Sequence, residues 1–71
     1  MYRSVAMTPE EKFGLLKSLL ERGVEVRTYY KSRRVAVLEK TDGQVVIRYE
    51  DGNCDKIHIR DFTRRRFVAV L

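Results

Sequence analysis

The hydrophobic period of this chain changes once, at Gly23, and the change divides the sequence into a helical part and a strand part. Before Gly23 the apolar residues recur at the 3.6-residue spacing of an α-helix. After Gly23 apolar and polar residues alternate in short runs that are rich in β-branched and aromatic residues. We therefore expect an α+β domain that is mainly β, with one N-terminal helix followed by strands.

The predicted helix covers residues 8–22 and has a well-defined start. Thr8 suits the N-cap because its hydroxyl can accept a hydrogen bond from the Glu11 amide, and Pro9 loses no needed donor at the first helical position. Five apolar side chains form one stripe that we expect to face the core: Phe13, Leu15, Leu16, Leu19 and Leu20. Residues 1–7 show no clear period, and we expect a flexible arm there, before a single domain of residues 8–71.

Five strands are expected, at about residues 24–30, 34–40, 44–50, 56–60 and 66–71. Asp42-Gly43 is the pair that a type I′ hairpin turn prefers, and residues 60–63 interrupt the alternation as one 3₁₀ turn. Short strands joined by tight turns favour a bent antiparallel sheet closed into a small SH3-like or Sm-like barrel, with the helix covering one open end. The alternative is an open meander with the helix packed on one face.

The composition excludes several classes of protein. A length of 71 residues allows one domain. Cys54 is the only cysteine, which excludes an internal disulfide and a cysteine-rich zinc site. No apolar run approaches the roughly 18–20 residues that span a bilayer, and the N-terminus lacks the apolar stretch of a secretory signal. We therefore expect a cytoplasmic protein with no membrane partner.

The residues needed for catalysis are scarce. His58 is the only histidine, Cys54 has no evident base near it in sequence, and the four glycines form no phosphate-binding loop. We expect no enzyme activity, no metal and no cofactor. Because His58 lies between Ile57 and Ile59, it belongs on the outer face of the fourth strand, as a surface residue or as a contact to a phosphate or base.

Basic residues give the clearest functional signal. The chain has 15 Lys and Arg against 10 Asp and Glu, a formal net charge of +5. One basic group surrounds the first hairpin, with Tyr29 beside it: Arg27, Lys31, Arg33 and Arg34. A second group surrounds the last turn: Arg60, Arg64, Arg65 and Arg66. Because the first and last strands of a five-stranded barrel are usually neighbours, we expect the two groups to form one patch.

Arginine pairs with phosphate through two hydrogen bonds and stacks on bases, and tyrosine adds a stacking face. We therefore expect a non-catalytic regulator or chaperone that binds RNA or another single-stranded nucleic acid. The expected contact residues are Arg27, Tyr29, Lys31, Arg33, Arg34, Lys56, His58, Arg60, Arg64, Arg65 and Arg66. Two alternatives remain: a solvated basic edge that prevents strand pairing, and a protein-interaction module, either a Tudor-like adaptor or a small inhibitor protein.

The last predicted strand suggests self-association. Residues 67–71, Phe-Val-Ala-Val-Leu, are apolar on both faces, although a small barrel buries only one face of a strand. The second face therefore lies under the helix or meets a second subunit. A homo-oligomer formed through this strand is an expected partner arrangement.

Residues 13–71 resemble the Sm-like family, and bacterial Hfq in particular. The shared features are the N-terminal helix, Val24–Tyr29 as a first strand, the break before the last strand, and the lysine and histidine of Lys56-Ile57-His58. The resemblance implies an Sm-like barrel, RNA binding, and edge-to-edge pairing of strands between subunits. Ala36 lies where the family has a strand-bending glycine, and Val45 or Val46 lies where Hfq stacks an aromatic residue on uridine, so that pocket is not carried over.

The chain also resembles the Tudor-type barrels. Val46–Gly52 is similar to their strand and turn, and Ile59–Phe62 is similar to the step before their last strand. This resemblance implies recognition of methylated side chains by an aromatic cage. The available aromatic residues are Tyr29, Tyr30 and Tyr49, whose strand positions do not suggest that they converge.

Overall fold

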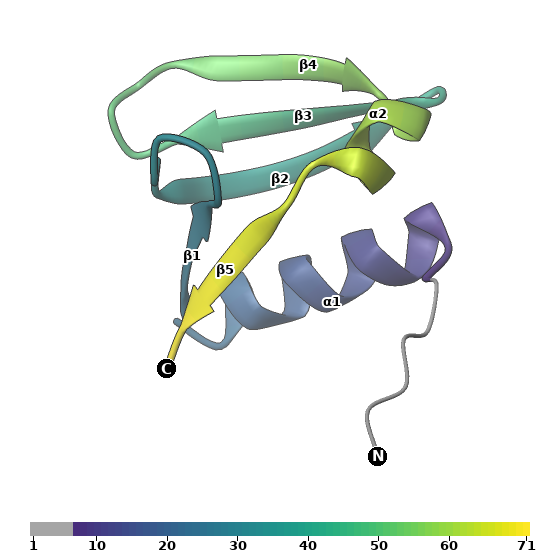
Figure 1. The fold of residues 1–71 in the computed structure, drawn as a ribbon. Coiled ribbons are helices and arrows are strands. Elements are labelled where there is room, and N and C mark those ends of the chain that lie inside the picture. The colour runs from purple at the N-terminus through teal and green to yellow at the C-terminus, as the bar shows by residue number, and fades with distance from the viewer. Residues whose placement is uncertain (1–6) are drawn as a thin grey trace.

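A computed structural model describes residues 7–71, so the predicted N-terminal arm lies outside the described residues except for Met7. The elements follow in the order α1 (Pro9–Glu21), β1 (Glu25–Thr28), β2 (Val35–Thr41), β3 (Gln44–Tyr49), β4 (Cys54–His58), α2 (Ile59–Arg64) and β5 (Phe67–Val70) (Figure 1). The α+β class with one main helix and five antiparallel strands is thus confirmed. Neither helix of the described part is long and apolar enough to cross a membrane.

Helix α1 begins as its sequence predicts. The Thr8 hydroxyl accepts a hydrogen bond from the Glu11 amide at 3.1 Å, and the Glu11 carboxylate accepts one from the Thr8 amide at 3.2 Å. Phe13 and Leu16 are buried, but Leu15 is 50% exposed. The prediction that Leu15 faces the core is therefore wrong, because this residue lies at the outer edge of the apolar stripe.

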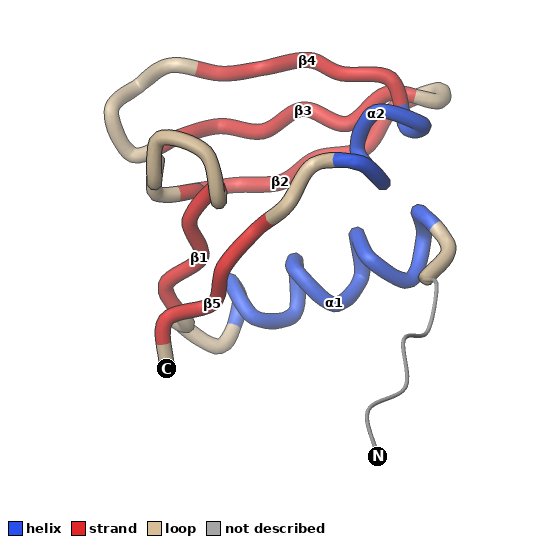
Figure 2. Tube along the Cα trace, viewed as in Figure 1, coloured by secondary structure: helices blue, strands red, loops and turns tan. Residues whose placement is uncertain are grey.

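The strands form two antiparallel sheets rather than a closed barrel. One sheet has the order β2-β3-β4 and the other pairs β1 with β5, with a single bridge between Arg27 and Arg34 joining them. Figure 2 shows α2 between the end of β4 and the start of β5. The predicted closed barrel is wrong because residues 59–64 form this helix instead of one 3₁₀ turn, and no pairing links β4 to β5 in the described residues.

Phe62 of α2 lies at the centre of the core and is fully buried. Its ring centroid is 6.3 Å from that of Phe13 on α1 and 5.7 Å from that of Phe67 on β5. Complete burial of such a side chain contributes about 1.5–3 kcal/mol to folding. Phe62 therefore fixes where the polypeptide leaves α2, and so where the following arginines lie.

Lys12 fastens α1 to the end of α2. Its Nζ donates to the carbonyl oxygens of Phe62 at 2.9 Å and Thr63 at 3.2 Å, and also to that of Arg65. The Phe62 and Thr63 carbonyls belong to the last turn of α2 and the Arg65 carbonyl to its C-cap, a region where few backbone donors are available to helix carbonyls; the Phe62 oxygen also accepts from the Arg65 amide at 3.2 Å. The same ammonium lies 5.2 Å from the centroid of the Phe62 ring.

The β5 strand leaves apolar side chains uncovered. Val68 and Val70 are both exposed, so α1 does not cover them. Of the two arrangements expected from the sequence, coverage by the helix is thus wrong for these two residues. The second arrangement, contact with another subunit, stays a prediction.

We predict that Lys12→Met lowers the free energy of unfolding by about 1.5–3 kcal/mol, because three carbonyl groups lose a charged donor. Lys17→Met is the matched control, since Lys17 is an exposed residue of the same helix. Urea denaturation of both variants measures the difference. Equal losses in the two variants would contradict the role given to Lys12.

Candidate functional site

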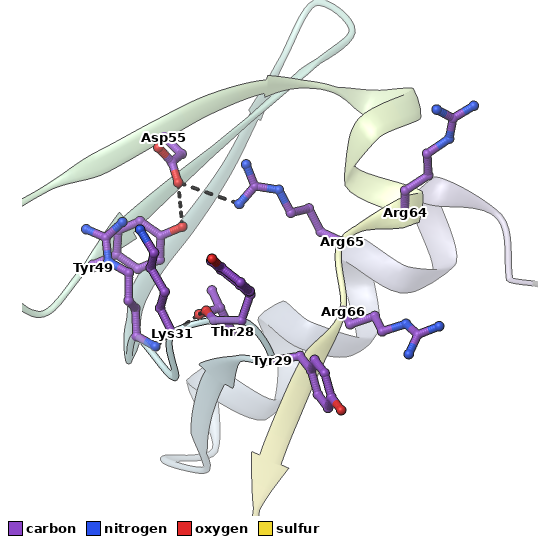
Figure 3. A pocket seen from close by; sticks show the side chains of 10 residues that line it. Thr28, Tyr29, Lys31, Tyr49, Asp55, Arg64, Arg65 and Arg66 are labelled. Atoms are coloured by element: carbon purple, nitrogen blue, oxygen red, sulfur yellow. Dashed lines mark hydrogen bonds and ion pairs between the residues drawn. The ribbon is translucent and has the colours of Figure 1, made fainter.

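Members of both basic groups predicted from the sequence meet at a cleft of about 500 Å³, called here the first cleft (Figure 3). It lies between the loop that joins β1 to β2 and the connection from α2 to β5. A backbone hydrogen bond from the Tyr29 amide to the Arg66 carbonyl, 2.9 Å long, joins these two segments. The lining consists of tyrosines, basic residues, one threonine and one aspartate: Thr28, Tyr29, Tyr30, Lys31, Arg33, Tyr49, Asp55, Arg64, Arg65 and Arg66.

The loop between β1 and β2 is held in shape by Thr28. Its amide donates to the Arg33 carbonyl at 2.9 Å, its hydroxyl donates to the Tyr30 carbonyl at 2.6 Å, and the same oxygen accepts from the Arg33 amide at 3.0 Å. Lys31 and Ser32 have φ values of 67° and 49°, in the left-handed region that favours glycine. The loop therefore holds two ordinary residues in a strained conformation, and this turn presents Tyr29, Tyr30 and Lys31 to solvent.

Tyr49 forms the inner wall of the first cleft. Its side chain is only 4% exposed, and the guanidinium carbon of Arg33 lies 3.9 Å from its ring centroid. The Tyr49 hydroxyl donates to Asp55 Oδ2 at 2.7 Å, and Arg65 Nη1 lies 3.7 Å from the same oxygen. Burial, followed by the hydrogen bond to Asp55, raises the pKa of Tyr49 above its ordinary value.

The three consecutive arginines do not point the same way. Figure 3 shows Arg65 directed toward Asp55, whereas Arg64 and Arg66 point away from it. Arg66 instead lies beside Tyr29, with its guanidinium carbon 5.9 Å from the ring centroid. No carboxylate of residues 7–71 lies within ion-pair distance of Lys31, Arg64 or Arg66.

Five residues predicted from the sequence do not line this cleft: Arg27, Arg34, Lys56, His58 and Arg60. Arg27 pairs with Glu25, and Arg34 lies 3.9 Å from Glu25 and 3.6 Å from Glu50. The hydrogen bond from Arg27 is the main cause that lowers the pKa of Glu25. These two arginines are therefore already matched by carboxylates.

The remaining residues of that set lie on or near β4, away from the first cleft. Lys56 alternates with Asp55 along β4, so the two side chains belong to opposite faces of the sheet. His58 is exposed, as predicted, but it also begins α2, because its Nδ1 accepts a hydrogen bond from the Arg60 amide at 3.1 Å. Sequence reasoning missed this capping role because histidine is not among the preferred N-cap residues.

The tyrosines named by the Tudor resemblance all line the first cleft, although their predicted strand positions did not indicate that they converge. The bend between the two sheets brings Tyr49 of β3 opposite the loop that contains Tyr29 and Tyr30. Four lining residues were not among the predicted contact residues: Thr28, Tyr30, Tyr49 and Asp55. Of these, Tyr30 and Tyr49 were named only through the Tudor resemblance, and no local pattern marks Thr28 or Asp55. No cluster of three or more histidine, cysteine or acidic residues suited to a metal occurs in the described part of the chain.

Comparison of the chain with family models, curated proteins and solved structures finds no match. The geometry and charge of the cleft are therefore the basis for interpreting it.

We predict that Ser32→Gly raises the free energy of unfolding by about 0.5–1 kcal/mol. Glycine removes the strain of a non-glycine residue in the left-handed region, and this gain in free energy exceeds the cost of the larger conformational entropy that glycine has in the unfolded chain. Ser18→Gly, at an exposed position in the last turn of α1, should instead lower the free energy of unfolding by about 0.5–1 kcal/mol. Urea denaturation of both variants provides the test, and a loss of stability in Ser32→Gly would contradict the strain described for this loop.

We also predict that stability falls as the pH rises above 10.0, the ordinary pKa of tyrosine. The folded state holds the Tyr49 proton more tightly than the unfolded state does, so this contribution is present below that pH and is lost as the pH rises through the folded pKa. Tyr49→Phe should show a smaller alkaline loss. Urea denaturation at several alkaline pH values measures this, and an identical loss in the variant would rule out Tyr49 as its source.

Proposed function

We propose that this chain is a non-catalytic protein that binds RNA or another single-stranded nucleic acid at the first cleft. The observation that supports this most directly is the set of cations without carboxylate partners in residues 7–71, Lys31, Arg64 and Arg66, around one cleft. Tyr29 and Tyr30, which are 65% and 76% exposed, lie beside them. Phosphates would bind the cations, and a base would stack on tyrosine.

The charge of the lining favours an anion over a methylated cation. Five basic residues line the first cleft against one acidic residue, Asp55. That carboxylate already accepts a hydrogen bond from Tyr49 and lies near Arg65. Arg33 covers the Tyr49 ring, so this ring is not free to form a wall of an aromatic cage.

A protein-interaction module is the second candidate, because an acidic protein surface would use the same free cations. The two sheets and the bridge between Arg27 and Arg34 also fit an opened SH3-like barrel, a fold type that serves both functions. A regulatory or chaperone role, a cytoplasmic location and a homo-oligomer through β5 stay predictions.

Fluorescence anisotropy with labelled single-stranded RNA, single-stranded DNA and duplex of equal length tests the proposal at several salt concentrations. Each phosphate contact on a single strand contributes a slope of about −0.7 to the logarithm of affinity against that of salt. The double variant Arg64→Ala/Arg66→Ala should bind more weakly and with a slope about 1.4 units shallower.

Arg60→Ala is the matched control for these substitutions. Arg60 is an exposed arginine of α2, the helix that ends at Arg64, but it does not line the first cleft. It should therefore change the affinity much less than either cleft arginine does. If none of the three nucleic acids binds, or if Arg60→Ala has the same effect as a cleft substitution, the proposed function is wrong.

A further inference from the structure

A second cleft, of about 740 Å³, lies on the other side of the connection from α2 to β5. It is lined by residues of α1 and of this connection, and it shares four lining residues with the first cleft: Tyr29, Arg64, Arg65 and Arg66. The two clefts are therefore neighbours with a common wall. Figure 3 shows Tyr29 and Arg66 of this wall lying away from Tyr49 and Asp55 of the first cleft.

The surface of the second cleft is chemically different from that of the first. Met7, Leu15 and Phe67 supply apolar surface, and Leu15 is 50% exposed. No aspartate or glutamate lines the second cleft. An exposed leucine alone would need no explanation, but here it lies in a hollow next to arginines that have no carboxylate partner in residues 7–71.

We infer that the second cleft binds an unpaired base of the same strand whose phosphates bind at the first cleft, an inference that rests on the proposed function. Arg64 and Arg66 belong to the wall between the clefts, so a phosphate held by them is attached to a nucleotide that can turn toward either side. The Tyr29 ring offers a stacking face, and Leu15 and Phe67 offer apolar contact to the base.

This arrangement defines the class of ligand. A base can enter the second cleft only when it is free of its pairing partner and its stacked neighbours, as in single strands, loops and bulges. A duplex presents the same phosphates but keeps its bases stacked inside. The second cleft therefore favours single strands over duplexes, while the cations alone would not.

An abasic strand separates the contribution of the bases from that of the phosphates. Anisotropy titrations would compare a single-stranded DNA with an abasic deoxyribose-phosphate strand of equal length. We expect the abasic strand to bind about tenfold more weakly to the unaltered protein, with a similar salt slope. Leu15→Ser should reduce this difference in affinity without changing the salt slope.

Val37→Ser is the matched control, because Val37 is 45% exposed and lines neither cleft. Urea denaturation establishes that each variant is folded. If Leu15→Ser does not fold, Met7→Ser gives the same test, since Met7 lies outside every helix and strand.

The outcomes distinguish the two proposals. If the abasic strand binds as tightly as the DNA, or if Leu15→Ser behaves like Val37→Ser, the second cleft is not a base site, although the proposed function stands. Equal behaviour of Leu15→Ser and Val37→Ser would mean that the apolar surface of the second cleft binds a protein partner or no ligand. If neither strand binds and single-stranded RNA of equal length also does not bind, the proposed function itself is wrong.

Discussion

The rest of this structure depends on the packing of the buried Phe62 side chain. A chain of this size has a small core, and one aromatic ring in it touches a ring from α1 and a ring from β5. Lys12 reinforces the contact by satisfying carbonyl groups at the end of α2. The path from α2 into β5 is thereby determined, and with it the position of the arginines that follow α2.

Some arginines of this molecule pair with carboxylates and others do not, and the net charge alone does not distinguish the two groups. Arg27 and Arg34 lie near carboxylates that bind them, as expected of a solvated strand edge. Such exposed pairs contribute little to stability. Arg64 and Arg66 have no such partner in residues 7–71 and border both clefts. The surface available to a polyanion is therefore smaller than the total number of basic residues suggests.

Local patterns in the sequence predict the elements of this fold well, and their arrangement in space less well. The capping box at Thr8 and the turn at Asp42-Gly43, whose φ values are 30° and 76°, form as predicted because each depends on neighbouring residues alone. The helix around Phe62 was not predicted, because six residues are too few to show a period. The closed barrel was wrongly expected for the same reason, since that short helix separates β4 from β5 and no pairing links these two strands in the described residues.

The candidate site follows the same division. The proximity of Lys31 and Arg33 to the arginines after α2 was predictable from the expected pairing of the first and last strands. The opposite directions of Arg65 and Arg66 were not, because they depend on where Asp55 and Tyr29 lie in space. Tyr49 entered the site through the bend between the two sheets, which leaves no signature in the sequence.

One backbone hydrogen bond, from the Tyr29 amide to the Arg66 carbonyl, joins two segments that lie far apart in the sequence. Neither segment forms the first cleft by itself, so this cleft exists only while β5 remains docked on β1. A molecule that binds both segments must favour the docked state, and so it would raise the free energy of unfolding of the whole domain. In a chain this short, ligand binding at the first cleft and folding of the domain would therefore be thermodynamically coupled.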